Sequence, residues 1–338
     1  MIQTVNHGVL LRPSGRPFES QAVLNPGCLL EGGILHLVYR AVAPGNYSSI
    51  GYAQFKDNQL IYRSEEPILK VDYAVEQHGL EDPRLVYCDG TYYLFYVMYD
   101  GTDAQVAYAT AKNLPHFTKQ GIISSRVTYE DVGTICVSNE VDGVYKGFCY
   151  TPGNAYPWRD SLLWEKDSFI FPRKFNGKYA LIYRFSPGIQ VLFFDDFSQL
   201  TPAYWLKNFE TLSQNTVLLP QHSFEGLFLG GGCPPIETEA GWLFIYHAVS
   251  SIEGKRVYQA AAALLDRDDP THVLGRLSYP LFSPDHLWEQ QGDVPNVVFP
   301  TGAVVKDGDL FIYYGAADSC IAYCSLNLAS LLEELVKG

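Results

Sequence analysis

The sequence has few charged residues and no long apolar run, and both shortages narrow the possible functions. Charged residues make up 18% of the 338 residues, and the formal net charge is −13. Nucleic acids and anionic membranes are bound by basic surfaces, so this charge balance argues against both partners. No apolar run is long enough for a transmembrane helix. The first residues, MIQTVNHGVLLRPSG, lack the charged and apolar regions of a secretory signal, and we expect a cytoplasmic protein.

The sequence also lacks the common cofactor motifs. Its seven cysteines form no C-x-x-C pair, and its histidines do not have metal-ligand spacing, so we predict no metal site. No P-loop occurs, and the glycine run at 230–232 is followed by two prolines, which cannot open the helix of a dinucleotide-binding fingerprint. We expect the cysteines to be reduced and buried. We predict no cofactor.

Aromatic residues, in contrast, are abundant. They make up 14% of the chain, with 24 tyrosines, which is typical of β-sheets with polar-aromatic surfaces. Five segments share one pattern, in which a turn glycine opens an apolar, aromatic strand that ends at a polar residue. They span residues 32–41, 90–100, 177–186, 241–250 and 308–318. Their repeated tyrosines are Tyr39, Tyr96, Tyr183, Tyr246 and Tyr313.

This recurrence predicts an all-β fold, a five-bladed β-propeller in which antiparallel sheets are arranged radially. A β-sandwich of two packed sheets is the alternative. In a propeller, the polar residues that end the repeated strands would meet at one mouth of the central channel, where ligands bind. These residues are Arg40, Asp100, Arg184, His247 and Asp318.

The chain reads as one domain over residues 1–338, since no linker or low-complexity tract divides it. We place the propeller at about residues 25–320. Near the end, Leu328, Leu331, Leu332 and Leu335 have helical spacing, which predicts a short C-terminal helix over residues 326–337. We expect Asn327 to cap its start.

The stretch GLEDPR, residues 79–84, is unusual because three charged residues stand directly before an apolar strand. Pro83 should push Asp82 away from helical backbone angles toward an extended conformation. Burial raises the pKa of a carboxyl group and a nearby arginine lowers it, a combination that can tune a general acid. The alternative is a buried pair of Glu81 or Asp82 with Arg84 that only braces the sheet.

The longer stretch GLEDPRLVY resembles the G-x-E-D-P-R signature of glycoside hydrolase family 130, which contains β-mannoside phosphorylases and β-1,2-mannosidases. Further blocks resemble the family and follow in the family's order: YSSIGYAQF, FPRKFNGKYALIYR, GGGCPPIETEAGWLFIYH, ALLDRDDP, NVVFPTGA and YYGAAD. Together they extend from about Asn25 to Asp318. The resemblance implies a five-bladed β-propeller enzyme that acts on β-mannosides, with inorganic phosphate as a co-substrate.

The resemblance also implies roles for individual residues. Asp82 falls on the family's catalytic acid, which protonates the leaving oxygen through a hydroxyl of the bound mannose. Phosphate attacks the anomeric carbon from the opposite face. Phosphate contacts fall on Arg184, His247, Tyr258 and Lys166. Ser49 and Asp318 fall in blocks that line the mannose subsite, and the other candidates for sugar binding are Arg40, Glu81 and Arg84.

One position departs from the family pattern. The family's phosphorylases have a lysine nineteen residues before the histidine, where this chain has Phe228. The family's hydrolases have lost parts of the phosphate pocket and activate water with carboxylates, and Glu225 is a candidate for such a base. An inverting β-1,2-mannosidase is therefore the alternative function, and a non-catalytic sugar-binding propeller is a remote one. We favour an inverting phosphorylase that releases α-mannose 1-phosphate, because the other aligned phosphate positions are retained.

The expected partners are a β-mannoside oligosaccharide and phosphate, with no nucleic acid and no membrane. The sequence leaves open whether the linkage is β-1,2 or β-1,4, and whether the protein is a homo-oligomer.

Overall fold

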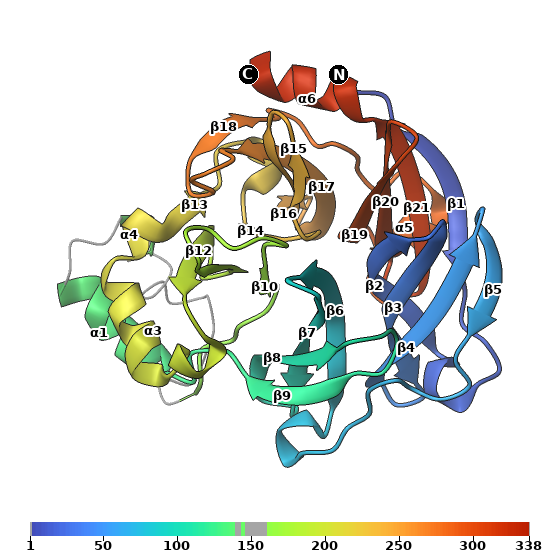
Figure 1. Ribbon diagram of the computed structural model, residues 1–338, viewed down its shortest axis with the longest axis horizontal. Coiled ribbons are helices and arrows are strands. Elements are labelled where there is room, and N and C mark those ends of the chain that lie inside the picture. Colours follow the sequence, from blue (N-terminus) through green and yellow to red (C-terminus); the bar gives the residue numbers. More distant parts are fainter. Residues whose placement is uncertain (1, 139–142, 146–160, 338) are drawn as a thin grey trace.

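The computed structural model describes residues 2–138, 143–145 and 161–337, and most of these residues lie in antiparallel β-sheets. Among the described residues the sheets are open, and none closes on itself. Figure 1 shows them set around a common centre, with β2, β6, β10, β14 and β19 nearest to it. The predicted all-β character is confirmed.

The largest sheet has eight strands in two antiparallel halves. The halves are joined by one parallel bridge between Ser48 and Gly79. The first half contains β2 (Ala22–Glu31), β3 (Ile34–Ala43), β4 (Tyr47–Lys56) and β5 (Gln59–Arg63). The second contains β6 (Gly79–Cys88), β7 (Thr91–Tyr99), β8 (Ala104–Ala111) and β9 (Thr118–Ile122).

The three remaining sheets follow along the chain. The first contains β10 (Phe169–Ile170), β11 (Tyr179–Tyr183), β12 (Ile189–Phe194) and β13 (Thr216–Leu218). The next contains β14 (Phe228–Gly231), β15 (Ile236–Thr238), β16 (Gly241–Ile252), β17 (Lys255–Leu265) and β18 (Val273–Arg276). The last contains β19 (Val298–Lys306), β20 (Asp309–Ala316), β21 (Cys320–Asn327) and β1 (Val5–Leu11), so the first strand pairs with the last.

Short helices fill the connections. The α-helices are α1 (Tyr129–Ser138), α3 (Pro202–Glu210), α4 (Leu212–Asn215), α5 (Leu287–Gln290) and α6 (Leu328–Lys337). Single 3-10 turns are η1 (Pro17–Glu19), η2 (Ala74–Glu76), η3 (Phe197–Gln199) and η4 (Ser223–Glu225). None of the helices in the described part of the chain is long and apolar enough to cross a membrane.

Four of these short elements, η1, η2, η4 and α5, each carry a fully buried glutamate. We call each of these glutamates, together with its partners, a Glu–Tyr unit. In η1, η4 and α5 the glutamate accepts a hydrogen bond from a tyrosine hydroxyl on the second strand of its group, and in η2 it lies near such a tyrosine. A residue from the outermost strand also contacts each carboxylate. The units are Glu19–Tyr39–Arg63, Glu76–Tyr96–Lys119, Glu225–Tyr246–Arg276 and Glu289–Tyr314–Asn6.

These units explain the repeated tyrosines of the sequence. Three of the five repeated tyrosines belong to a unit, namely Tyr39, Tyr96 and Tyr246. In the last segment the residue that bonds the glutamate is Tyr314, not its neighbour Tyr313. The third segment differs, because Tyr183 accepts a hydrogen bond from Asn208 of α3 at 2.6 Å.

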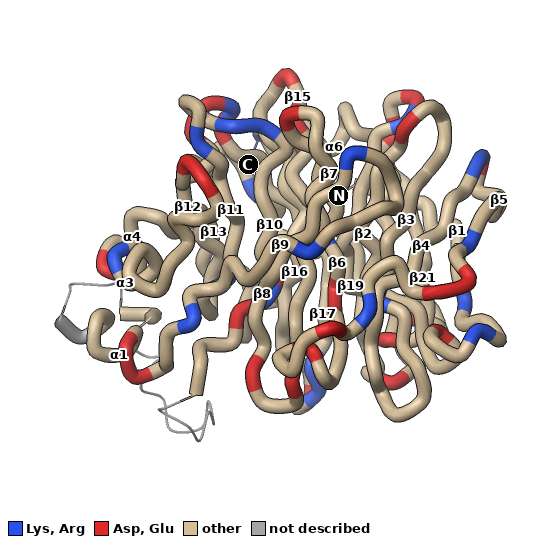
Figure 2. Tube along the Cα trace, turned by 60° about the horizontal axis from the view of Figure 1, so that its bottom comes forward, with Lys and Arg blue, Asp and Glu red and all other residues tan. Residues whose placement is uncertain are grey.

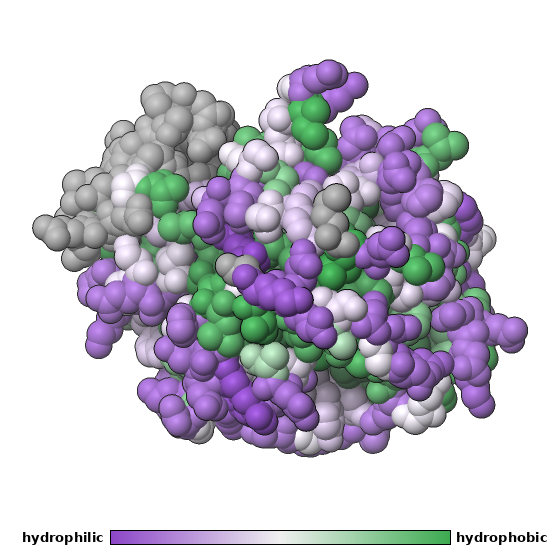
Figure 3. Space-filling view, turned by 90° about the horizontal axis from the view of Figure 1, so that it is seen from above, coloured by the Kyte–Doolittle hydropathy of each residue, from purple (hydrophilic) through white to green (hydrophobic). Residues whose placement is uncertain are grey.

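The predicted C-terminal helix is present, but it begins at Leu328 and not at residue 326, because β21 extends to Asn327. Asn327 Oδ1 accepts a hydrogen bond from the backbone N–H of Ser330 at 3.0 Å, which caps α6. Leu331 and Leu335 are buried against the last two sheets. An apolar groove of about 730 Å³ runs between α6 and β15. On the side of the molecule that carries α6, Figure 3 shows hydrophobic residues exposed among hydrophilic ones.

Charged residues gather mainly on turns at the two ends of the strands, as Figure 2 shows. The charged residues of the GLEDPR stretch are an exception, because they lie within β6 and are largely buried.

Candidate active site

The GLEDPR stretch forms a β-bulge in β6. The register between β6 and β7 shifts between Glu81 and Arg84, so Asp82 and Pro83 have no direct partners on β7. Asp82 has a φ of +47°, in the left-handed region that non-glycine residues seldom adopt. The expected extended conformation of Asp82 is therefore wrong, because the bulge rotates this residue out of the strand. Backbone strain of this kind is frequent at functional sites.

The carboxylate of Asp82 is held by polar neighbours and keeps limited access to solvent. Its side chain is 10% exposed. Asn25 Nδ2 donates a hydrogen bond to Asp82 Oδ1 at 2.7 Å, and Arg40 lies 3.7 Å from the same oxygen. Asn25 itself lies close to Gly315, where any side chain would collide with its amide. No pattern in the sequence singles out Asn25.

Glu81 lies between two cations. Its two oxygens are each 2.9 Å from a basic group, Oε1 from Arg40 and Oε2 from Lys166. Burial opposes ionisation of Glu81, but Arg40 and Lys166 outweigh it and lower the pKa to about 2. Arg40 also donates to Ser48 Oγ at 2.8 Å, whereas the predicted Ser49 is half-buried beside it on β4. Lys166 and Arg40 thus belong to the same cluster as the GLEDPR carboxylates.

Arg84 points into the protein. Its guanidinium donates to the carbonyls of Gly231 and Gly232 at 3.1 and 2.6 Å, and it lies between the rings of Phe169 and Phe299. The exposed fraction of the residue is 1%. These contacts favour the bracing role of Arg84 over direct sugar binding.

Asp167 connects this part of the site with the predicted phosphate residues. Its Oδ1 is 3.4 Å from Arg84, and its Oδ2 is 2.7 Å from Arg184 and 3.8 Å from His247 Nε2. Burial raises the pKa of Asp167, but Arg184 and the other nearby cations outweigh it, so the pKa lies below its ordinary value. Sequence reasoning missed Asp167, although it directly follows the predicted Lys166.

His247 is fully buried, and burial lowers its pKa to about 3, so the imidazole is neutral. Neither ring nitrogen has a hydrogen-bond partner among the described residues. A side chain at Gly230 would collide with this ring, so the glycine of the GGG run gives the histidine its space. A buried neutral imidazole can donate one hydrogen bond and accept one. It is therefore suited to a ligand oxygen.

Phe228 occupies the position where the family has a lysine, and its ring faces the same cluster. The Arg184 guanidinium lies 5.3 Å from the centre of the Phe228 ring. The rings of His247 and Tyr258 lie 6.5 and 6.3 Å from it. The structure thus brings Arg184, His247 and Tyr258 together, with an aromatic ring where the lysine would be.

Asp318 lies at the turn between β20 and β21, near enough to Arg40 for their charges to interact. Burial raises its pKa to about 6, with contributions from the charges of Asp82, Asp293 and Glu81, while Arg40 acts in the opposite direction. The predicted mannose-contacting carboxylate therefore shares the electrostatic environment of Asp82.

Glu225 lies on the opposite side of β16 from this cluster. It accepts hydrogen bonds from the backbone N–H groups of Gln221 and His222, from the Tyr246 hydroxyl and from Arg276. Neighbouring residues of a strand point to opposite faces, so the partner of Tyr246 lies away from His247. Glu225 belongs to the Glu–Tyr unit of the sheet that contains β14–β18. This position favours a structural role.

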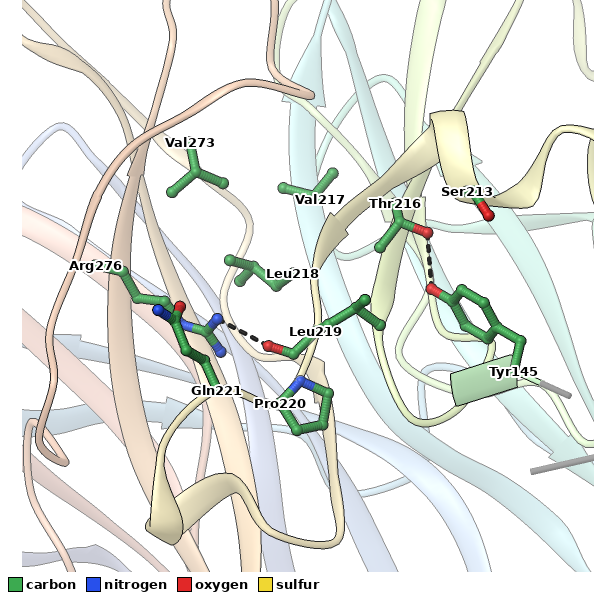
Figure 4. A pocket seen from close by; sticks show the side chains of 10 residues that line it. All are labelled: Tyr145, Ser213, Thr216, Val217, Leu218, Leu219, Pro220, Gln221, Val273 and Arg276. Carbon is green, nitrogen blue, oxygen red and sulfur yellow. Dashed lines mark hydrogen bonds between the residues drawn. The ribbon is translucent and has the colours of Figure 1, made fainter. Parts of the chain in front are cut away.

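A separate cavity of about 510 Å³ lies between the sheet of β10–β13 and the sheet of β14–β18 (Figure 4). In it, Arg276 donates to the carbonyl of Leu219 at 2.8 Å, and the hydroxyls of Tyr145 and Thr216 are 2.7 Å apart. None of the predicted site residues lines this cavity. Among the described residues, no group of three or more His, Cys, Asp or Glu side chains is arranged to hold a metal ion.

Two relatives of known name are phosphorylases of β-1,2-linked mannosides. A 1,2-β-oligomannan phosphorylase of Thermoanaerobacter sp. (strain X514) is 32% identical over 334 residues, which cover 96% of each chain. A β-1,2-mannobiose phosphorylase of the same organism is 30% identical over 321 residues, covering 90% of this chain and 89% of that one.

A solved structure has the same fold. The β-1,2-mannobiose phosphorylase from Listeria innocua, in complex with β-1,2-mannobiose, superposes with a TM-score of 0.72 at 23% identity, covering 97% of this chain and 96% of that one. The family model described as β-1,4-mannooligosaccharide phosphorylase matches residues 8–146 and 151–337. The chain belongs to glycoside hydrolase family 130.

Proposed function

We propose that this protein is an inverting β-mannoside phosphorylase, which uses inorganic phosphate to cleave β-mannosyl oligosaccharides and releases α-mannose 1-phosphate. One observation carries the proposal most strongly. A buried, neutral His247, without a hydrogen-bond partner in the described part of the chain, lies beside Arg184 in the same cluster as the Asp82 carboxyl. Both full-length relatives are named as phosphorylases of β-1,2-linked mannosides, and the family model is described by β-1,4-linked ones.

Asp82 is the proposed acid. An inverting reaction needs a proton for the leaving oxygen on one side of the sugar and a nucleophile on the other. Asn25 and Arg40 hold the Asp82 carboxylate in place, which supports a defined direction for proton transfer through a mannose hydroxyl. Glu81, with a pKa of about 2, stays ionised at neutral pH and is the less suitable donor. Ser49, Arg40 and Asp318 are proposed to contact the mannose.

The proposed phosphate site contains Arg184, His247, Tyr258 and Lys166. Arg184 can donate two hydrogen bonds to an oxyanion, and His247 and Tyr258 can donate one each. Lys166 is bound to Glu81 at 2.9 Å and would act mainly through its charge. The aromatic ring of Phe228 removes water from this side of the pocket, and a drier pocket strengthens the remaining charge interactions.

The hydrolase alternative loses its proposed base. An inverting hydrolase needs a second carboxylate that activates water opposite the acid. The hydrogen bonds of Glu225 go to Tyr246, Arg276 and its own turn, on the far side of β16 from His247. We therefore do not assign water activation to Glu225.

The proposal includes the architecture of the enzyme. We infer one catalytic domain built as a five-bladed β-propeller, in which the two halves of the largest sheet are separate blades. The repeated Glu–Tyr units and the position of β2, β6, β10, β14 and β19 near the centre of Figure 1 support this inference. We also propose a cytoplasmic location, where the six described cysteines, all of them buried, would stay reduced.

The test is the product formed from β-1,2- and β-1,4-mannobiose with and without inorganic phosphate. We expect cleavage only with phosphate, and α-mannose 1-phosphate as the product. The Asp82→Asn variant is the matched control, because its amide keeps the oxygen that accepts from Asn25 but has no acidic proton. It should fold normally and lose at least about a hundredfold in turnover. Release of free mannose at a rate independent of phosphate would refute the phosphorylase.

A further inference from the structure

A row of aromatic rings runs outward from the candidate active site. Tyr47 stacks on His78 at 6.0 Å between ring centres, His78 meets the edge of Tyr99 at 5.9 Å, and Tyr99 meets Trp164 at 6.0 Å. The ammonium of Lys166 lies 5.8 Å from the Trp164 ring. We call Tyr47, His78, Tyr99 and Trp164 the aromatic row. Each ring contacts the next, so the four side chains form one continuous row.

The strands bring these residues together at one edge of the largest sheet. Tyr47 is the first residue of β4, His78 directly precedes β6, and Tyr99 is the last residue of β7. The bridge between Ser48 and Gly79 sets the first two side by side. At the adjoining turn, a side chain at Gly101 would press against the imidazole of His78, so this glycine leaves space for the ring.

The row is partly exposed to solvent, and its inner end contacts the candidate active site. Tyr47 is 54% exposed, His78 is exposed, and Tyr99 and Trp164 are half-buried. At the inner end, Lys166 connects Trp164 to Glu81, the residue before the proposed acid. Exposed aromatic rings in succession are costly in water unless they serve a ligand or partner. Because the row begins beside Lys166 and Glu81, we expect its ligand to be part of the same substrate that binds in the candidate active site.

We propose that the aromatic row binds the part of a β-mannooligosaccharide that extends beyond the bond being cleaved. The C–H faces of a pyranose are apolar and pack on aromatic rings, and the sugar hydroxyls find partners at the tyrosine hydroxyls and the imidazole. A neutral, extended chain of such units fits a neutral row of rings better than an anion does. The proposal rests on the proposed function and adds a preference for substrates longer than a disaccharide.

The test compares a disaccharide with a tetrasaccharide of the same linkage, at saturating phosphate, in the wild type and in Tyr47→Ala. Tyr47 is at the end of the row away from Trp164 and Lys166, so its loss should leave the KM for the disaccharide unchanged. We expect the KM for the tetrasaccharide to rise about threefold to tenfold, the range expected for the loss of one aromatic contact. Tyr99→Ala should raise the same KM further.

Tyr87→Ala is the matched control. Tyr87 is 48% exposed and stacks on Tyr92, but it lies near the opposite end of β6, about 26 Å along the strand from Gly79. Its loss should change neither KM. Equal changes for both substrates in Tyr47→Ala, or no change for the tetrasaccharide, would overturn the proposal. So would a change in the molecular mass of Tyr47→Ala in solution, which would identify the row as a contact between subunits.

Failure of the proposed function gives a different result. If the wild type does not cleave the disaccharide with phosphate, the phosphorylase is refuted before the row is tested. Calorimetric titration of the tetrasaccharide into the wild type and Tyr47→Ala without phosphate then tests the row alone. Weaker binding by Tyr47→Ala would support it, and equal binding would refute it.

Discussion

Asp318 lies in surroundings that make its ionised form costly. Burial and the nearby carboxylates of Asp82, Asp293 and Glu81 raise its pKa from 3.8 to about 6, although Arg40 acts against them. The folded protein therefore binds a proton at Asp318 between pH 4 and 6 that the unfolded chain does not bind. The stability contributed by this group is greatest below pH 4 and is lost as the pH rises through 6.

Replacing Asp318 with asparagine should make the protein more stable at neutral pH. The amide would carry no charge, so the gain should approach about 3 kcal/mol above pH 7 and vanish below pH 4. Urea midpoints of the wild type and Asp318→Asn at pH 4 and pH 8 measure the difference. Asp307→Asn, at an exposed turn of the same sheet, should show no such pH dependence. Equal gains at both pH values would contradict the prediction, and activity of Asp318→Asn should fall at either pH.

Part of the candidate site could be predicted from the sequence, because the charged residues of GLEDPR are neighbours in the chain. The resemblance to the family then implied which of them is the acid. Asn25 and Asp167 reach the site from 57 and 83 residues away in the chain, to Asp82 and Arg84 respectively. Nothing in their own neighbourhoods marks them, because their roles depend on which sheets meet at the centre.

At the scale of secondary structure, each Glu–Tyr unit connects a short turn or helix with the second and the outermost strand of one strand group. In the sheet of β14–β18, Glu225 caps η4, accepts a hydrogen bond from the Tyr246 hydroxyl of β16 at 2.8 Å and pairs with Arg276 of β18 at 2.6 Å. The carboxylate is fully buried, so its loss leaves a buried arginine without its counter-charge. These contacts favour a structural role for the unit.

Glu225→Gln should therefore lower stability without changing the reaction. We expect a loss of about 3 kcal/mol in the free energy of unfolding, because one partner of a buried ion pair is removed. Glu237→Gln, on β15 of the same sheet, is the comparison, since this carboxylate is partly exposed and its pair with Arg173 contributes little. Denaturant unfolding measures both. A folded Glu225→Gln whose turnover falls a hundredfold at unchanged stability would restore Glu225 as a catalytic base.

The repeated tyrosines could be recognised in the sequence, but the glutamates that bind them could not. Tyrosines recur at similar places in apolar strands, which predicted the repeated architecture. Their glutamates lie in short turns outside the strands, for example Glu19 before Tyr39 and Glu289 before Tyr314. The shift from Tyr313 to Tyr314 arises because strand alternation decides which of two adjacent tyrosines faces the glutamate.

At the scale of the whole molecule, the first strand pairs with the last, which fixes the N-terminal segment to the last sheet. β1 pairs with β21, and Asn6 of β1 donates to Glu289 and to the Tyr314 hydroxyl at 3.2 Å each. Neighbouring sheets also contact one another near the centre, where Thr301 of β19 donates to the carbonyl of Pro26 in β2. The N-terminal segment thus stabilises a sheet whose other strands lie some 290 residues further along the chain.

Deletion of residues 2–11 should destabilise the entire protein, although no predicted site residue lies in this segment. The deletion exposes the edge of β21 and leaves the Glu289 unit without Asn6, and an unpaired edge strand also promotes aggregation. We expect one cooperative unfolding transition at a clearly lower temperature, with activity lost in parallel. Calorimetry and activity after heating measure the two together. If the sheets were independent, the deletion would split unfolding into two steps and leave the later one unchanged. That result would contradict a fold in which the pairing of β1 with β21 supports the whole protein.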